Sequence, residues 1–227
     1  MFNIRWTALM TAVLFAGGCE TARYTEAFYP EADVDRVVIQ SDAGGVELSA
    51  GSRLRVERTI RAPEGALELS HRIVTEADGE EVLYLKADCR PIIPCSVDMN
   101  ITIPDGVEVE VVLEQGEVWA SGIGALSVEL SRGSLDVDIL GPLQAQIGSG
   151  DASVSLPANT SATVAVGRGD ITLSIPAGLW QLAIDAAQQK VDDEIVPSQS
   201  PSVGNIQLIA PAGAVRVAPV AQLVDVG

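Results

Sequence analysis

Two cysteines, Cys89 and Cys95, are the side chains best placed for covalent chemistry, because only the five residues Arg-Pro-Ile-Ile-Pro separate them. In an exported chain, two cysteines this close usually form a disulfide. A redox-active pair is the alternative, but such sites place two residues between their cysteines. A zinc site would lack a ligand, because the chain has a single histidine. We therefore predict a structural disulfide between Cys89 and Cys95 and no metal site.

That single histidine, His71, lies in the segment Leu-Glu-Leu-Ser-His-Arg-Ile, in phase with its apolar residues, as Arg58 does in its own segment. We favour a structural role for His71, because buried polar groups find partners. A catalytic base is the functional alternative. Gly148-Ser-Gly150 lacks the spacing of a serine nucleophile, and no glycine-rich phosphate loop precedes a helix. We predict no catalytic residues and no cofactor.

Outward-facing acids offer one further chemistry. Asp136 and Asp138 project from one face of a predicted strand, and stacked repeats could align them with other carboxylates into a calcium-binding ladder. The acids in question are Glu117, Glu129, Asp151 and Asp170. The glycine-rich calcium-binding nonapeptide is missing, and surface acids usually remain solvated, which is the interpretation we favour. The tripeptide Arg168-Gly-Asp170 matches a short integrin-recognition motif, but the repeat described below already explains it.

Cys19 follows an N-terminal stretch typical of a secretory signal, residues 1–18, with Arg5, an apolar run and the small residues Ala16-Gly17-Gly18. The apolar run is too short to span a bilayer, which needs roughly 20 residues. Small residues before a cysteine resemble the bacterial lipobox, although the usual Leu is replaced by Ala16. We predict lipidation at Cys19 and attachment to the cell envelope, in the outer membrane of a Gram-negative bacterium. An ordinary secreted protein is the alternative.

Composition narrows the classes of partner. The formal charge of −17 repels nucleic acid, so we expect no nucleic-acid binding, and it favours cationic partners. Hydrophobic residues make up 47% of the chain, which is ample for a core. Aromatic residues make up only 4%, which disfavours long carbohydrate-stacking surfaces.

A glycine-led unit recurs along the chain in the form glycine, small or acidic, apolar, polar, apolar. Its glycines Gly116, Gly133, Gly150 and Gly169 are separated by 17, 17 and 19 residues. Gly45 and Gly213 begin similar units outside this array. We predict that these six glycines supply positive φ at tight turns between strands.

Segments that alternate between apolar and polar residues lie between the glycines, at the two-residue period of a half-buried strand. The predicted inward residues are Leu126, Val128, Leu130, Leu135, Val137, Ile139, Leu143, Ala145 and Ile147. The predicted outward residues are Ser127, Glu129, Asp136, Asp138, Gln144 and Gln146.

Stacked copies of such a unit bury a continuous apolar face, which predicts an all-β right-handed β-solenoid with a less regular N-terminal section. A repeat-built β-sandwich is the alternative. After the signal, we expect a tether over 19–35, a single domain over 36–218 and a tail over 219–227. Within the domain, the array should be most regular over 97–184 and interrupted by an acidic excursion over 185–205.

The glycine units, Gly45-Val-Glu-Leu and Ile101-Thr-Ile-Pro-Asp-Gly together resemble the adhesin-like β-strand-repeat family of bacterial envelope proteins of unknown function, related to auto-transporter adhesin heads. The resemblance covers about 36–173. It implies a right-handed β-solenoid that is often exported or lipid-anchored, and it brings no catalytic residues.

The preferred hypothesis is a non-enzymatic envelope lipoprotein that presents a rigid acidic surface for adhesion or envelope interaction. Its partners would be the membrane, through the lipid, and an envelope protein or surface ligand. The alternative is a periplasmic structural or regulatory scaffold that binds a protein by edge-strand pairing. A polysaccharide-active enzyme is less favoured, because no site of paired carboxylates with aromatic subsites is evident.

Overall fold

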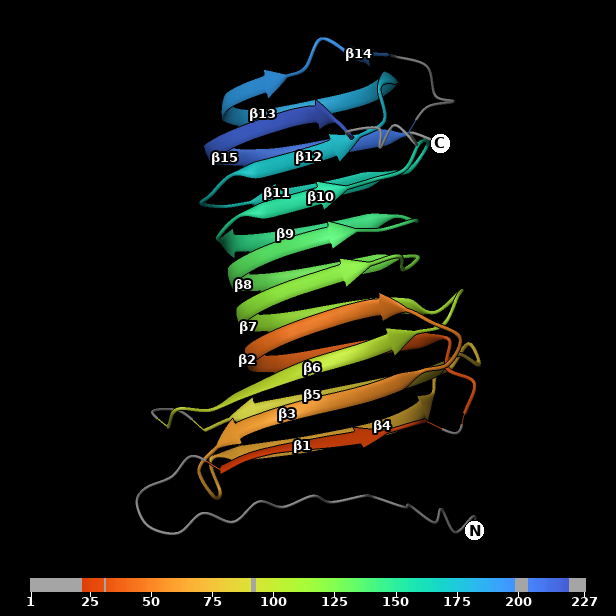
Figure 1. The fold of residues 1–227 in the computed structure, drawn as a ribbon, viewed down its shortest axis with the longest axis vertical. Helices are drawn as coiled ribbons and strands as arrows, with labels where there is room; N and C mark the ends of the chain where they lie inside the picture. Colours follow the sequence, from red (N-terminus) through yellow and green to blue (C-terminus); the bar gives the residue numbers. More distant parts are fainter. Residues whose placement is uncertain (1–21, 31, 91–92, 199–203, 221–227) are drawn as a thin grey trace, which may run out of the picture.

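A computed structural model of the protein describes residues 22–30, 32–90, 93–198 and 204–220, and these residues form strands and turns (Figure 1). The all-β class is thereby confirmed. In chain order the strands are β1 (Ala22–Phe28), β2 (Arg36–Ala50), β3 (Arg55–Ala62), β4 (Leu67–Thr75), β5 (Glu81–Cys89), β6 (Ser96–Ile103), β7 (Glu108–Ser121), β8 (Leu126–Asp138), β9 (Leu143–Ser149), β10 (Ala152–Ser155), β11 (Ala162–Val166), β12 (Ile171–Ile175), β13 (Gly178–Val191), β14 (Ile195–Pro197) and β15 (Asn205–Pro219). Within the described residues, no helix is long and apolar enough to cross a membrane.

The sheet has an antiparallel section at the N-terminal end and is parallel elsewhere. Strand β1 pairs antiparallel with β3, β3 with β6, and β4 with β5. Strand β2 joins this section to the rest, because it pairs in parallel with β5 along its first half, with β6 along its second half, and with β7 along most of its length. The antiparallel section lies at one end of the long axis and β13 and β14 lie at the other (Figure 1).

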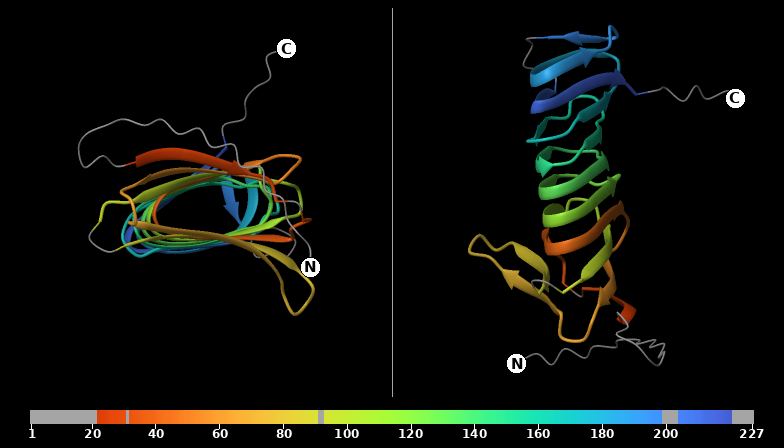
Figure 2. Two further views of the ribbon diagram at one scale, coloured as in Figure 1. Left: turned by 90° about the horizontal axis from the view of Figure 1, so that it is seen from below. Right: turned by 90° about the vertical axis from the view of Figure 1, so that its left-hand side faces the viewer.

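The parallel strands close on themselves, which makes the predicted β-solenoid and its β-sandwich alternative wrong. Pairing runs from β8 through β10, β12, β15, β11 and β9 and returns to β8, so six parallel strands form a closed barrel to which the other strands are added. Viewed along the long axis, the strands encircle the interior (Figure 2, left). The alternating pattern predicted strands but not closure, because closure requires β8 and β15 to continue past Gly133 and Gly213 and to pair with a different strand on either side of the glycine.

Neighbouring parallel strands place equivalent repeat positions side by side. Leu126 of β8 aligns with Val109 of β7 and with Leu143 of β9, each 17 residues away, and Ala152 aligns with Ile171, 19 residues away. The spacing of the glycines is therefore the register of the sheet. All nine residues predicted to face inward on β8, β9 and the turn between them are at most 3% exposed, and all six predicted outward residues are exposed, so this prediction is confirmed.

The repeat glycines form a column in which the backbone of one glycine occupies the space that a Cβ on the next repeat glycine would need. A Cβ added to Gly133 would lie 1.6 Å from the carbonyl oxygen of Gly116, and one added to Gly150 would lie 1.6 Å from that of Gly133. Gly116, Gly133, Gly150 and Gly169 also have φ between 134° and 156°, which L side chains rarely adopt. Glycine at these positions therefore allows both the bend of the backbone and the close approach of neighbouring strands.

Three details of the glycine prediction were wrong. Gly116 and Gly133 lie inside β7 and β8, so these strands bend at the glycine without ending in a turn there. The column passes through Gly44, which aligns with Gly116 and has φ 132°, whereas Gly45 aligns with Glu117. Gly213 does belong to the column, because its Cβ would lie 1.7 Å from the Gly169 carbonyl oxygen. Its φ is not positive, however, so the prediction of positive φ is wrong at this glycine.

The predicted tether and excursion also need correction. Residues 22–28 of the tether form β1, which covers one edge of β3. Residues up to Val191 in the predicted excursion continue β13, and β14 adds a short parallel pairing at Ile195–Pro197. Strand β15 continues to Pro219, which pairs with Ile175. The signal at 1–18 and Cys19 lie outside the described residues.

Replacing Gly133 with alanine should lower the free energy of unfolding by more than about 2 kcal/mol, because both φ and the Gly116 carbonyl oppose a Cβ. Gly124→Ala is the matched control, because its Cβ would have no atom within 4 Å. Denaturant unfolding of the two variants makes the comparison. Equal stability of the two would contradict the role of the glycine column.

Candidate functional site

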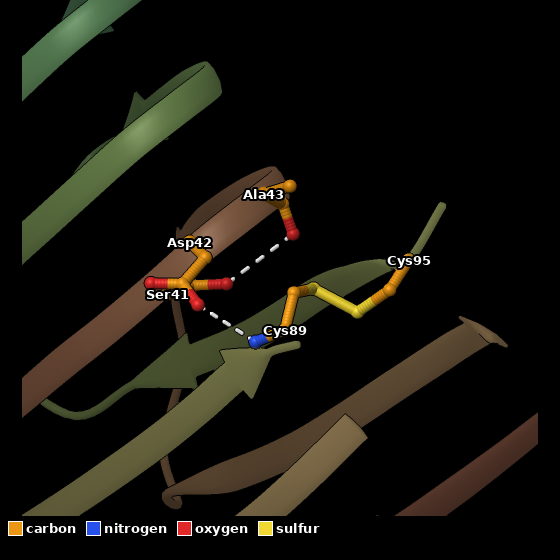
Figure 3. The surroundings of a disulfide bond; sticks show 5 residues. All are labelled: Ser41, Asp42, Ala43, Cys89 and Cys95. Carbon is orange, nitrogen blue, oxygen red and sulfur yellow. Dashed lines mark hydrogen bonds between the residues drawn. A yellow bond between two sulfur atoms is a disulfide. The ribbon is translucent and has the colours of Figure 1, made fainter. Parts of the chain in front are cut away.

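The structure joins Cys89 to Cys95 in a disulfide at the junction of three strands (Figure 3). Cys89 ends β5, and Cys95 directly precedes β6. The backbone N–H of Cys89 donates to Asp42 Oδ2 of β2 at 2.7 Å, and the Ser41 hydroxyl donates to the Ala43 carbonyl at 3.3 Å. The disulfide therefore closes the connection between the two strands that pair with successive halves of β2, which is a structural position.

Three acids accept backbone hydrogen bonds from neighbouring strands next to the glycine column. Asp98 Oδ1 accepts the N–H of Gly45 at 3.1 Å, Asp151 Oδ1 accepts that of Asp170 at 2.8 Å, and Asp170 Oδ1 accepts that of Ala214 at 2.7 Å. Asp151 and Asp170, which directly follow repeat glycines, thus tie one unit of the repeat to the next. This contact explains the Asp of Arg168-Gly-Asp170 by structure alone.

The calcium ladder, which the sequence offered only as the less favoured alternative, is not assembled among the described residues. Among the described residues, the acids whose oxygens lie close enough together to hold a metal are Glu76, Asp78 and Glu80, none of which belongs to the repeat. Arg36 lies beside this group, with Nη2 2.7 Å from Glu76 and 3.8 Å from Glu80. The guanidinium already balances part of the negative charge there.

His71 lies at the N-terminal end in a stack of side chains from three strands. Its ring stacks on the ring of Phe28 of β1, with 4.5 Å between the ring centroids. The guanidinium carbon of Arg58 on β3 lies 5.0 Å from the same Phe28 centroid. Arg58 is 1% exposed and its Nη1 lies 3.4 Å from Glu26, while burial lowers its pKa. Burial and then the charge of Arg58 lower the pKa of His71. This grouping is a packed cap on the core, without a nucleophile.

A cleft of about 830 Å³ lies on the outer surface of β2, β3, β6 and β7, and sequence reasoning missed it. One transverse row of aligned residues crosses its floor, and the row continues onto β8. The row consists of Glu57 on β3, Asn100 on β6, Glu47 on β2, Trp119 on β7 and Asp136 on β8. The residues are far apart in the chain, so only the register of the sheet brings them together.

Trp119 is the aromatic side chain of this cleft and is 41% exposed. Its indole lies over Gly45, where an added Cβ would be 3.1 Å from a ring carbon. The lack of a side chain at Gly45 therefore leaves room for the indole to lie against the backbone of β2. By contrast, Trp180 is 3% exposed and donates its indole N–H to the Pro176 carbonyl at 2.8 Å.

Four carboxylates and one guanidinium line the cleft, which makes it acidic. They are Glu47, Glu57, Asp98, Glu117 and Arg61. Arg61 Nη1 is paired with Asp98 at 2.8 Å, and Glu57 is paired with Arg55 just outside. The chain after residue 103 is also negatively charged, because it carries fifteen acidic and four basic residues. Such a site can hold a ligand by charge and by the indole face.

Comparison with known proteins gives distant similarities only. No protein-family model and no curated protein matches the chain. Among solved structures, a "putative cell adhesion protein" from Clostridium sporogenes aligns with 11% identity and a TM-score of 0.46, covering 88% of this chain and 100% of that one. A "putative adhesin" from Bacteroides fragilis aligns with 13% identity and a TM-score of 0.41, covering 88% and 99%. A "putative lipid binding protein" from Parabacteroides distasonis has 12% identity and a TM-score of 0.32, covering 86% and 97%. At these TM-scores the similarity supports neither a shared family nor a shared ligand.

Removing the disulfide in a Cys89→Ser, Cys95→Ser double variant should lower the free energy of unfolding by about 2 kcal/mol, because the unfolded chain regains the entropy of a short loop. Denaturant unfolding with and without reductant measures the effect. The wild type should lose stability on reduction and the double variant should not respond. A response of the double variant would assign the loss to another part of the chain.

Raising the pH from about 5.5 to about 7.5 should increase stability through His71. The folded-state pKa of His71 lies below its ordinary value of 6.5, so the unfolded chain binds the proton more readily. The contribution is complete above the unfolded pKa and is lost as the pH falls from there through the lower folded pKa. Because His71 is the only histidine, His71→Gln should flatten this slope, measured by denaturant unfolding at several pH values. An unchanged slope would contradict the assignment.

Proposed function

We propose that this protein is a non-enzymatic binding protein of the cell envelope, attached through a lipid on Cys19, that uses its acidic outer surface for adhesion. The observation that carries the proposal is the open cleft in which Trp119 stands exposed between carboxylates. Exposed aromatic side chains on a polar surface are typical of binding sites, because they supply contact area with little loss of conformational entropy. Function is thus argued from a site rather than from the fold.

The frame beneath the cleft suits a binding role. Its lining comes from four strands of one sheet, paired by continuous ladders, and the residues below them belong to the main core. A site on strands is held more firmly than one on loops, and a preorganised site loses less entropy on binding. Rigid presentation of this kind supports adhesion better than catalysis that depends on closure around a substrate.

The N-terminal end supports attachment close to a membrane. Strand β1 begins at Ala22, so two residues separate Cys19 from the sheet. A lipid on Cys19 would hold the antiparallel end near the bilayer, and β13 and β14 lie at the opposite end of the long axis (Figures 1 and 2). The acidic section beyond residue 103 would then point away from anionic headgroups, which repel it.

A periplasmic scaffold that binds by strand pairing is the second candidate. Strand β4 pairs with β5 alone among the described strands, so its other edge can accept a strand from a partner. Its outer residues are mostly exposed, including Ile73 at 37%. Such a partner would be reached inside the envelope, whereas adhesion requires the cell surface.

Protease treatment of intact cells should cleave the native protein if it is a surface adhesin, and the protein should fractionate with membranes. A Cys19→Ser form is the control for lipid attachment and should leave the membrane fraction. A periplasmic protein of the same cells should remain intact and so report envelope integrity. Protection of the native protein until the outer envelope is opened would overturn the adhesion role and favour the scaffold. Membrane association of Cys19→Ser equal to that of the native form would remove the lipid anchor.

A further inference from the structure

We infer that the cleft around Trp119, hereafter the Trp119 cleft, binds a positively charged segment of a partner protein, with an arginine or lysine side chain against the indole. This inference rests on the proposed function that the protein is a binding protein, and it names the ligand chemistry of that function. The argument depends on the indole, on the carboxylates around it and on the shape of the surface.

The indole presents one face to solvent because the other lies over Gly45 of β2. The π-face of tryptophan attracts a cation, and arginine can additionally stack on it through its planar guanidinium. Trp119 has no cation of its own, since none of the cation–π contacts in the described residues involves it. The open face is therefore available to a cation from another molecule.

Carboxylates flank the indole on both sides along the transverse row. Glu47 aligns with Trp119 from β2 and Asp136 aligns with it from β8, at the spacing of adjacent strands, about 4.8 Å. Glu117 precedes Trp119 by two residues on β7 and lies on the same face. A cation on the indole would thus lie among three carboxylates, whose interaction with it strengthens as water is displaced.

These three carboxylates differ from the others of the cleft in their partners. Asp98 is held by Arg61 and by the N–H of Gly45, and Glu57 is held by Arg55. Among the described residues, Glu47, Glu117 and Asp136 form no ion pair, and Glu47 accepts one hydrogen bond, from Asn100 at 3.2 Å. Their negative charge is therefore not balanced within the chain, which complements a cationic ligand.

The shape of the surface favours a protein segment over a small cation. The cleft is open and spans four strands, so it can accept several residues of an extended chain. Beyond Asp136 the row continues with the small polar residues Ser153 and Thr172 on β10 and β12, which leave room for the segment to run on. A neutral segment would gain little binding free energy from a negatively charged surface, and an anionic segment would be repelled by it.

Binding of the blocked peptide acetyl-(Gly-Arg)₃-amide to the full chain in detergent, measured by isothermal titration calorimetry, tests the inference. The peptides acetyl-(Gly-Glu)₃-amide and acetyl-(Gly-Ser)₃-amide and the neutral glycan maltohexaose are the comparison ligands. The wild type should bind the arginine peptide alone, and the affinity should fall as salt is raised from about 0.05 M to about 0.3 M, because salt screens the charges.

Three cleft variants should weaken that binding, and one matched variant should not. Trp119→Ala should reduce affinity by about fivefold or more, and Trp119→Phe should fall between it and the wild type, because phenylalanine offers a weaker cation–π surface. Glu117→Gln should also reduce affinity, whereas Glu129→Gln, an exposed acid of β8 outside the cleft, should leave it unchanged. Unfolding curves of all variants should match that of the wild type, which confirms that folding is intact.

Each contrary result has a distinct meaning. The cationic ligand is overturned if the wild type does not bind the arginine peptide. It is also overturned if Trp119→Ala and Glu117→Gln bind the peptide as tightly as the wild type does. Binding of maltohexaose that depends on Trp119 also overturns it, while the proposed binding function stands. Protease protection on intact cells overturns the adhesion role, and calorimetry reports on the cleft independently of that result.

Discussion

The close contact between successive repeat glycines is the constraint on which the rest of this structure depends. In the column from Gly44 to Gly213, the carbonyl oxygen of one glycine lies where the Cβ of the next would be. From Gly44 to Gly169, no other residue permits both this approach and the positive φ found there. Because the strands meet backbone to backbone, the pairing of β2 with β7 and of β7 with β8 continues through the bend. The same strand can then contribute to two walls of the sheet, and the parallel strands can close.

Charge is arranged on this frame in two ways. Asp98, Asp151 and Asp170 take part in the hydrogen bonding of the fold, because they accept backbone hydrogen bonds beside the glycine column. Glu47, Glu117 and Asp136 project outward and are balanced by no ion pair in the described residues. Asp151, Asp170 and Glu117 each directly follow a repeat glycine, yet only the two aspartates accept a neighbouring N–H.

The facing of side chains could be predicted from the sequence, whereas the closure of the sheet and the cleft could not. Alternation assigns Leu126 inward and Glu129 outward, since the two-residue period is a local property. Whether a ladder continues through Gly133 depends on the neighbouring chain at Gly116, which a local pattern does not contain. Trp119 gains its role from Glu47 and Asp136, which register brings beside it from other strands.

Strand β1 was missed for a different reason, and its position has a mechanical consequence. Its inward residues include Glu26, which pairs with the buried Arg58 and so interrupts the apolar alternation of the segment. If a lipid at Cys19 and a ligand at the Trp119 cleft pull in opposite directions, the tension enters through β1 and passes to β3, β6 and β2. Seven aligned residue pairs join β1 to β3. A pull along the long axis runs across the strands (Figure 1), so it would load these pairs one after another from the Ala22 end, and β1 would separate from β3 before the parallel barrel is strained.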